Sequence, residues 1–309
     1  MAFTAKDVAE LRKQTGCGMM DCKNALVEAD GDFEKAIKVL REKGVATAEK
    51  KASRIAAEGL VAIMTEGNVT AMVEVNSETD FVAKNDSFRA FVDGILRTII
   101  ANRPADVEAL KACKFDNTDD TVEAVLQEKT FTIGEKLSLR RFLIVDGIVS
   151  TYVHGIGVTG VIVGFETSAE IAAKAEFKEF AKNIALQVAA MNCQYVDKDA
   201  VPAAVIAEET EILQKQMEQD PKMANKPAKV LEGIIQGKLG KFYDNNCLVE
   251  QAYVKEDNMK VKAYVANTAK ELGGDIKVTS FYRYDKGEGL QKREENFGDE
   301  IANMLGGKA

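Results

Sequence analysis

The stretch Gly59–Asn76, with the sequence GLVAIMTEGNVTAMVEVN, decides the fold of this chain. Its first part, Leu60–Met64, is a short apolar run of the kind found in buried strands. Glu66-Gly67-Asn68 then has the composition of a turn. In the part that follows, apolar residues alternate with a second set, which is the pattern of a strand with one buried face. The apolar set is Val69, Ala71, Val73 and Val75, and the second set is Thr70, Met72, Glu74 and Asn76. The stretch therefore predicts a β-hairpin.

A helix is expected after this hairpin, and the whole unit recurs further along the chain. The helix has Phe88, Phe91, Ile95 and Ile99 on one face. From Gly147 a strand, a turn at 154–157 and a second strand follow in the same order, and the next helix carries Phe177, Phe180, Ile184 and Val188. All four helical positions lie 89 residues after their counterparts, whereas Gly59 and Gly147 lie 88 apart. We infer two copies of one strand–turn–strand–helix unit, with one residue added in the second hairpin turn.

The fold class expected from these patterns is α+β, with an N-terminal three-helix bundle before the two duplicated antiparallel-sheet-plus-helix subdomains. Thr4-Ala5-Lys6-Asp7 resembles a helix capping box. Gly16 and Gly18 separate the first two helices, and the third is expected to stop at Gly44. Such a bundle resembles the ubiquitin-associated domains, which are also small three-helix bundles. The segment Lys43–Ala57 is rich in Ala, Lys and Glu and predicts a polar helical linker.

The region after the second copy predicts an antiparallel helical hairpin. Two helical runs, Val201–Met217 and Val230–Phe242, flank Asp220-Pro221 and Lys226-Pro227. Its apolar residues either form an arm that packs on a partner or on a second copy of the chain, or they pack only within the protein, and the sequence leaves both open. A helix near Val261–Leu272, a strand over 276–284 and a terminal helix near Glu294–Leu305 complete the prediction.

These elements define the domains that we expect. They are residues 1–53 (the bundle), 58–142 (the first core subdomain), 143–200 with 243–285 (the second core subdomain), 201–242 (the helical-hairpin insertion, a candidate homodimerisation arm) and 286–309 (a C-terminal helical module).

The composition is that of an ordinary soluble protein of two or three domains, and it disfavours several functions. The chain has 309 residues, of which 46% are hydrophobic and 29% charged. Its net charge of −8 has the wrong sign for a general phosphate-backbone binder, so we expect no direct nucleic-acid contact. No apolar run approaches the ~18 residues needed to span a bilayer. With five cysteines, no C-x-x-C pair and no signal-peptide pattern, we expect reduced thiols, no membrane contact and a cytoplasmic location.

Enzyme chemistry is not expected, although one motif suggests it. Gly155–Gly160 matches the dinucleotide fingerprint G-x-G-x-x-G, but the fingerprint needs a helix after it and here a strand follows. No phosphate-binding G-x-x-x-x-G-K-[ST] motif occurs. His154 is the only histidine, so a Ser-His or Cys-His pair would have to use it, yet no G-x-S-x-G elbow occurs and the nearest cysteine in sequence is Cys193. The shortage of ligands also disfavours a metal cluster. We therefore expect no cofactor, no metal and no catalytic residue. His154 is either an exposed or hydrogen-bonded turn residue or a polar contact to a protein partner.

The segment Thr79–Asn85, TDFVAKN, places a large aromatic residue between an acid and a lysine on a turn that should be exposed. Core packing is the simplest alternative for Phe81. The repeat argues against it, because Val82 matches Ile171 whereas Phe81 matches Glu170. The second copy builds the same turn without an aromatic residue there. An exposed aromatic that the fold does not need suits insertion into a partner.

Met19 and Met20 raise a similar question. Because they are adjacent, both cannot face one small helical core. Either one packs in the core and the other lies on the surface, or the pair forms a flexible apolar contact surface, which methionine supplies well.

The chain resembles the elongation factor Ts family from its N-terminus essentially to its end. The most specific motifs are Thr15-Gly16-Cys17-Gly18-Met19-Met20-Asp21-Cys22 with Lys23, and Thr79–Asn85; others are Ile133-Gly134-Glu135 with Arg140-Arg141, Tyr152-Val153-His154-Gly155 and Gly287-Glu288-Gly289. The chain is similar to the long bacterial form, which carries the helical-hairpin insertion. Longer stretches around Asn117–Asp120 and Tyr243–Glu256 depart from that form and are expected to be loop variations.

This resemblance implies a guanine-nucleotide exchange factor for the translational GTPase elongation factor Tu, with no catalysis of its own. It assigns four groups of residues to the partner. Arg12, Met19 and Met20 would hold the GTPase domain; Asp80, Phe81, Val82 and Ala83 would intrude beside the nucleotide and displace Mg²⁺; Ile133 and Gly134 would disturb the phosphate-binding loop; and His154 would contact a separate domain.

Two other functions remain open from the sequence. One is a non-catalytic adaptor, with a ubiquitin-associated-like bundle and an unrelated α+β binding domain, which would have no affinity for a GTPase. The other is an enzyme that uses the Gly155–Gly160 loop, which would respond to NAD or FAD.

Overall fold

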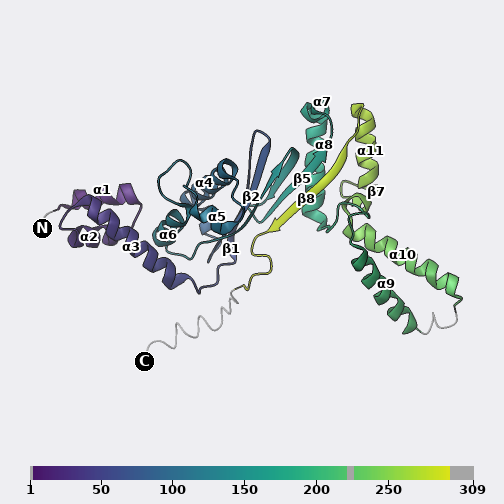
Figure 1. Ribbon diagram of the computed structural model, residues 1–309, viewed down its shortest axis with the longest axis horizontal. Coiled ribbons are helices and arrows are strands. Elements are labelled where there is room, and N and C mark those ends of the chain that lie inside the picture. Colours follow the sequence, from purple (N-terminus) through teal and green to yellow (C-terminus); the bar gives the residue numbers. More distant parts are fainter. Residues whose placement is uncertain (1–2, 221–225, 293–309) are drawn as a thin grey trace.

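The computed structural model describes residues 3–220 and 226–292, and two three-stranded antiparallel sheets lie at its centre (Figure 1). The sheets pack face to face through a small apolar cluster, and helices cover the outer face of each. The three N-terminal helices lie at one end of the molecule and a long helical hairpin lies at the other (Figure 1). The α+β class expected from the sequence is confirmed.

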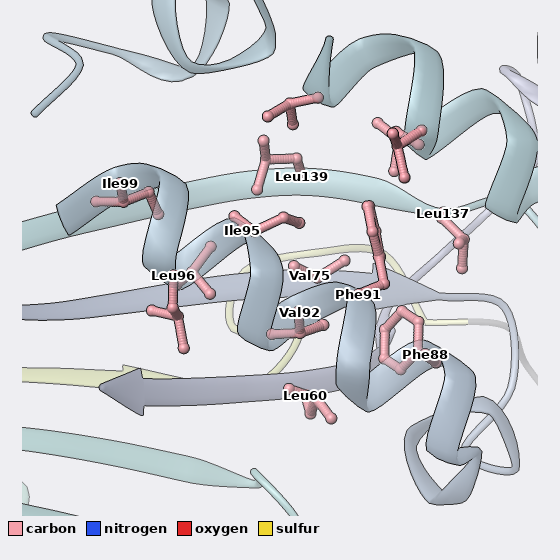
Figure 2. Packing of buried hydrophobic residues seen from close by; sticks show 14 of the residues in the cluster. Leu60, Val75, Phe88, Phe91, Val92, Ile95, Leu96, Ile99, Leu137 and Leu139 are labelled. Atoms are coloured by element: carbon pink, nitrogen blue, oxygen red, sulfur yellow. The ribbon is translucent and has the colours of Figure 1, made fainter. Parts of the chain in front are cut away.

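The first sheet contains the hairpin predicted over 59–76. Its strands are β1 (Glu58–Glu66), β2 (Val69–Ser77) and β3 (Ser138–Asp146), in the order β1-β2-β3. Its outer face is covered by α4 (Asp86–Asn102), α5 (Val107–Ala112) and α6 (Val122–Ile133). Val75 packs against Phe88 and Phe91 of α4 in one buried cluster (Figure 2), and Val73 belongs to the same cluster, as the alternation predicts. The domain boundary expected at residue 142 falls inside β3, which continues to Asp146.

The second sheet repeats this arrangement. Its strands are β4 (Ile148–His154), β5 (Thr159–Glu166) and β8 (Lys277–Asp285), in the order β4-β5-β8. It is covered by α7 (Ala169–Ala173), α8 (Ala175–Met191) and α11 (Val261–Leu272). A short 3-10 turn, η2 (Leu248–Glu250), and a two-stranded ribbon of β6 (Ala252–Tyr253) and β7 (Glu256–Lys260) lie beside them.

The structure confirms the internal repeat and extends it. The bounds of α4 and α8 differ by 89 residues at both ends. Beyond the unit expected from the sequence, α6 and α11 differ by 139 residues at both ends, and so do β3 and β8. Both of these last strands carry one bulged residue at the same place, Arg140 in β3 and Thr279 in β8. Each copy is therefore a hairpin, a helix, a second helix and a third strand.

The prediction that the second hairpin turn has one added residue is wrong. The β1–β2 loop has two residues between the paired Glu66 and Val69, whereas the β4–β5 loop has four between His154 and Thr159. The second turn is therefore two residues longer. The link from the second hairpin to its helix is one residue shorter, which restores the offset of 89 in the helices.

The N-terminal bundle consists of α1 (Ala5–Thr15), α2 (Met19–Glu28) and α3 (Phe33–Lys51). The predicted capping box is present, because Thr4 and Asp7 exchange hydrogen bonds at the start of α1. The predicted stop at Gly44 is wrong, since α3 continues to Lys51. Gly44 is buried and faces Gln127 and Phe131 of α6. This packing between α3 and α6 overrides the weak intrinsic preference of glycine against helix.

The predicted helical hairpin is formed by α9 (Ala203–Glu218) and α10 (Ala228–Asn246), which extend from the second copy as an arm (Figure 1). Leu213 and Met217 of α9 pack against Ile235 and Leu239 of α10. The terminal helix predicted near 294–305, and most of the module expected over 286–309, lie outside the described residues.

A buried ion cluster joins the two copies. The side chain of Glu74, on the inner face of β2, is 0% exposed. Arg140 Nη1 donates to its carboxylate at 2.9 Å, Arg141 Nε at 2.7 Å and the backbone N–H of Gly287 at 2.8 Å. Neighbouring residues of a regular strand point to opposite faces, so it is the bulge at Arg140 that lets both arginines reach one carboxylate. Because Gly287 follows β8, the cluster connects one copy to the other.

The ionised form of Glu74 is favoured in the folded protein. Burial alone would raise the pKa of this carboxyl group, but the hydrogen bonds from Gly287, Asn76 and the two arginines outweigh burial and hold the pKa below its ordinary value. The resulting stabilisation is present above the pKa of the unfolded chain, about 4.3. It is lost as the pH falls through the lower pKa of the folded state.

We expect Glu74→Gln to lower the free energy of unfolding by about 3–5 kcal/mol at pH 7, because both arginines lose their buried counter-charge. Urea titration at several pH values measures this, and the difference from the unsubstituted chain should shrink below pH ~4 as Glu74 becomes protonated. Asp146→Asn is the matched control, since Asp146 forms an exposed pair with Arg103 and should matter little. Equal losses from the two substitutions at pH 7 would contradict this role of Glu74.

Candidate functional site

The segment Thr79–Asn85 forms a tight turn that presents one aromatic ring to solvent. Its centre is the 3-10 turn η1 (Val82–Lys84), with Phe81 at the N-cap. The side chain of Phe81 is 74% exposed, the largest value among the large hydrophobic residues of the described chain. Phe81 is therefore not a core residue, and the expectation of an exposed aromatic is confirmed.

The residues that follow Phe81 face the other way. Val82 and Ala83 are each 5% exposed and belong to the buried cluster under α4. Of the four residues that the resemblance assigns to this part of the site, only Asp80 and Phe81 present their side chains to solvent. Val82 and Ala83 anchor the turn to the core.

Two hydrogen bonds attach the turn to the loop that follows α6. The backbone N–H of Thr79 donates to Glu135 Oε2 at 2.9 Å, and its hydroxyl donates to Glu135 Oε1 at 2.6 Å. We call this pair of bonds the Thr79–Glu135 bridge. The structure thus brings together two segments that the sequence singled out separately, Thr79–Asn85 and Ile133–Glu135. Gly134 is exposed and ends α6 in the left-handed conformation, whereas Ile133 is half-buried against the core.

The end of α3 reaches the same loop. Lys51 Nζ donates to the carbonyl of Gly134, and Lys136 Nζ donates to the carbonyl of Arg54 at 2.8 Å. Arg54 also pairs with Glu78 at 3.2 Å, and Glu78 accepts from the backbone N–H of Lys136 at 2.6 Å. The N-terminal bundle, the Phe81 turn and the Gly134 loop therefore meet at one hydrogen-bonded junction.

Lys84 restrains the exposed ring without covering it. Its Nζ lies 3.1 Å from Asp80 Oδ2 and 5.4 Å from the centroid of the Phe81 ring. Exposed ion pairs and cation–π contacts contribute roughly 0–1 kcal/mol each. A partner can displace these contacts at little cost.

The bundle carries a second exposed surface. Arg12, Met19 and Met20 are all exposed, and 61% of the surface of Met20 is accessible to solvent. The alternative in which one methionine packs in the core is therefore wrong. Val27 is also exposed and lies seven residues after Met20, on the same face of α2. Met19, Met20 and Val27 thus form an exposed apolar strip on α2, and the exposed Arg12 lies on the preceding helix, α1.

His154 lies at the end of β4 on the hairpin of the second copy. It is exposed, and the hydroxyl of Tyr152 lies 3.1 Å from its Nδ1. Ile156 and Val158 in the following loop are exposed as well. The hairpin is held against the first sheet, because the backbone N–H of Val61 donates to the carbonyl of Gly157 at 2.8 Å. No helix follows this loop, so the Gly155–Gly160 match is not a dinucleotide site.

Two motifs of the resemblance do not belong to an exposed site. Arg140 and Arg141 contact Glu74, and Arg141 also pairs with Glu288. The Gly287–Gly289 motif thus closes the ion cluster between the copies. The partners of Glu74 and Glu135 could not be predicted from the sequence, because contacts between distant segments leave no periodic signal.

The cysteines are free thiols, and two of them are held in their protonated form by burial. All five cysteines lie in the described residues without a disulfide, and burial raises the pKa of Cys193 to about 12 and that of Cys247 to about 11. These two thiols are therefore protonated near neutral pH. Over 3–220 and 226–292, no cluster of His, Cys, Asp or Glu side chains is suited to holding a metal ion. In the same part of the chain, no helix is long and apolar enough to cross a membrane.

Comparisons with known proteins agree on one family. A family model described as elongation factor TS matches residues 78–288. The chain is similar to the elongation factor Ts of Syntrophotalea carbinolica, at 45% identity over 98% of this chain and 99% of that protein. It is similar to that of Clostridioides difficile at 48% identity, over 98% of this chain and 99% of the relative. For Clostridium kluyveri the identity is 43%, over 99% and 100% respectively.

The two neighbouring residues of the turn should differ sharply in their effect on stability. Val82→Ala removes buried methyl groups and should lower the free energy of unfolding by about 2 kcal/mol. Phe81→Ala, its control, removes an exposed ring and should leave the melting temperature unchanged. Thermal unfolding of both variants measures this, and a large loss for Phe81→Ala would show that the ring supports the fold.

Proposed function

The chain belongs to the elongation factor Ts family, and from that premise we propose that it binds elongation factor Tu in its GDP-bound form and speeds the release of GDP. GTP then rebinds to the emptied GTPase. The protein forms and breaks no bond in this process. It acts by binding one conformation of its partner better than another. The observation that carries the proposal is the exposed ring of Phe81 on a turn that is otherwise buried or hydrogen-bonded.

Phe81 is suited to act as a wedge. Bound GDP is held largely by Mg²⁺ and by backbone donors to its phosphates. A ring inserted beside that site need only favour an arrangement in which these groups hold the nucleotide poorly. In this proposal Asp80 and Phe81 enter the partner, while Val82 and Ala83 support them from the core. Ile133 and Gly134 lie at the end of α6 beside this turn, and in this proposal they contact the phosphate-binding loop of the GTPase.

The energetics require more than one contact. To shift a two-state partner from mostly closed to mostly open takes about 5.5 kcal/mol of differential binding. A fully desolvated aromatic anchor supplies roughly 2–4 kcal/mol. The remainder must come from other surfaces, and in this proposal it comes from the exposed residues Arg12, Met19 and Met20 and from the hairpin that carries His154. By reciprocity, GDP weakens the binding of the exchange factor as much as the factor weakens the binding of GDP.

We expect Phe81→Ala to slow the stimulated release of GDP about tenfold, because a loss of ~1.4 kcal/mol corresponds to that factor. Release of a fluorescent GDP from elongation factor Tu, with and without the variant, measures the effect. Tyr282→Ala is the control, since it removes an exposed aromatic from the second sheet. Normal exchange with Phe81→Ala would contradict the wedge.

The methionine pair should act on affinity rather than on rate. Replacing Met19 and Met20 together by serine should raise the half-saturating concentration of the exchange factor by tenfold or more, since each methionine can contribute about 1.5–3 kcal/mol when buried. The maximal release rate should stay within about twofold, because the Phe81 turn is unaltered. Met191→Ser removes an equally exposed methionine elsewhere and is the control. An unchanged half-saturating concentration would exclude this surface from the interface.

A further inference from the structure

We propose that Glu135 is a positioning residue for nucleotide exchange, which acts through Thr79 to fix the direction in which Phe81 leaves the protein surface. The inference rests on the proposed function, and it adds a residue that contacts neither the nucleotide nor the exposed ring. Glu135 lies 56 residues from Thr79 in sequence, on the loop between α6 and β3. Its carboxylate accepts both bonds of the Thr79–Glu135 bridge.

Thr79 is held at each of its hydrogen-bonding groups. Its backbone N–H and hydroxyl are bound by Glu135, and its carbonyl accepts from the hydroxyl of the buried Ser77 at 2.8 Å. On the other side of Phe81, Val82 is buried and Asn85 caps α4 through bonds to two backbone N–H groups. Only Asp80 and Phe81 lie between these fixed points.

The ordering of this short segment has a physical consequence for binding. To fix one residue of a mobile backbone costs about 1–2 kcal/mol of conformational entropy. The Thr79–Glu135 bridge orders this residue during folding, so Phe81 need not be ordered in the step in which its ring inserts beside the nucleotide. Bonds to a carboxylate are stronger than neutral ones, which suits a bridge that is only half-buried.

The second copy of the repeat provides a natural comparison. The offset of 139 residues shared by α6–α11 and β3–β8 places Gly274 at the position of Glu135. The match is close, because Gly134 and Gly273 end their helices in the same left-handed conformation. Thr79 corresponds to Ser168, whose hydroxyl caps its own helix instead. The copy without the carboxylate is also the copy with Glu170 in place of Phe81. The bridge and the aromatic residue thus occur together, which indicates that the bridge serves Phe81 rather than the fold.

The test is a double-mutant cycle that uses the full-length chain and elongation factor Tu loaded with fluorescent GDP. Glu135→Ala should lower the release rate at saturating exchange factor by about tenfold, the effect of ordering one residue on binding. In a Phe81→Ala background the same substitution should cost less than about twofold, because Glu135 acts through Phe81. An equal cost in both backgrounds would show a general structural effect and overturn the inference.

Substitutions at Thr79 separate positioning from folding. Thr79→Ser keeps the hydroxyl and should retain the release rate of the unsubstituted chain, whereas the isosteric Thr79→Val loses one bond of the bridge and should be slower by severalfold. Glu170→Ala, at the exposed position equivalent to Phe81, is the control and should have no effect. Equal rates for Thr79→Ser and Thr79→Val would count against the bridge.

The same assay separates the positioning role of Glu135 from the proposed exchange function of the chain. If the unsubstituted chain stimulates release, Phe81→Ala is slow and Glu135→Ala is as fast as the unsubstituted chain, then the positioning role is wrong and the proposed exchange function stands. If the unsubstituted chain gives no stimulation, both are wrong.

Discussion

The charge of Glu74, buried between two sheets, is the constraint on which the arrangement of this protein depends. An isolated carboxylate in such a place would be prohibitively costly, so the groups that neutralise it must be held in position. They come from a bulge in β3 and from the backbone after β8, which belong to different copies of the repeat. The cluster therefore fixes one copy against the other. The Phe81 turn lies on the first copy and the His154 hairpin on the second, so their separation follows from the same contacts.

Much of this fold could be predicted from local patterns, and the failures have physical causes. The alternation over 69–76 and the four apolar positions of α4 predict the cluster between the first sheet and its helix, because the residues that share that buried face recur with the period of each element. The opposite face of β2 is buried as well, since Met72 and Glu74 are 0% exposed against the second sheet, and the alternation does not predict this. The exposure of Phe81 follows from comparing it with Glu170, its counterpart in the second copy. Gly44 could not be placed, because a contact with α6 decides its conformation. The added residues of the second hairpin turn are visible only in the pairing register.

The two copies show how one architecture carries two kinds of surface. The second copy keeps the anchor of the turn at Ile171, the helix end at Gly273 and the bulge in the third strand. It lacks the aromatic residue, the carboxylate of the Thr79–Glu135 bridge and the ion cluster, where Gly164 stands in the place of Glu74. The shared features are those that folding needs. The features confined to the first copy are the exposed aromatic residue and the bridge that holds its turn, together with the buried carboxylate that orients both copies.

The continuation of α3 through Gly44 has a consequence for the modularity of the chain. Three-helix bundles of this size are often regarded as independent units joined by a linker, and such units can be removed or transplanted. Here the second half of α3 covers α6, and Phe131 packs into the core of the bundle. A shortened chain that began at β1 would expose that surface of α6 to water and would lose the contacts of Lys51 and Arg54 with the Gly134–Lys136 loop. The bundle and the core are thus joined by packing and hydrogen bonds as well as by the chain, so removing the bundle would change the surface of the core.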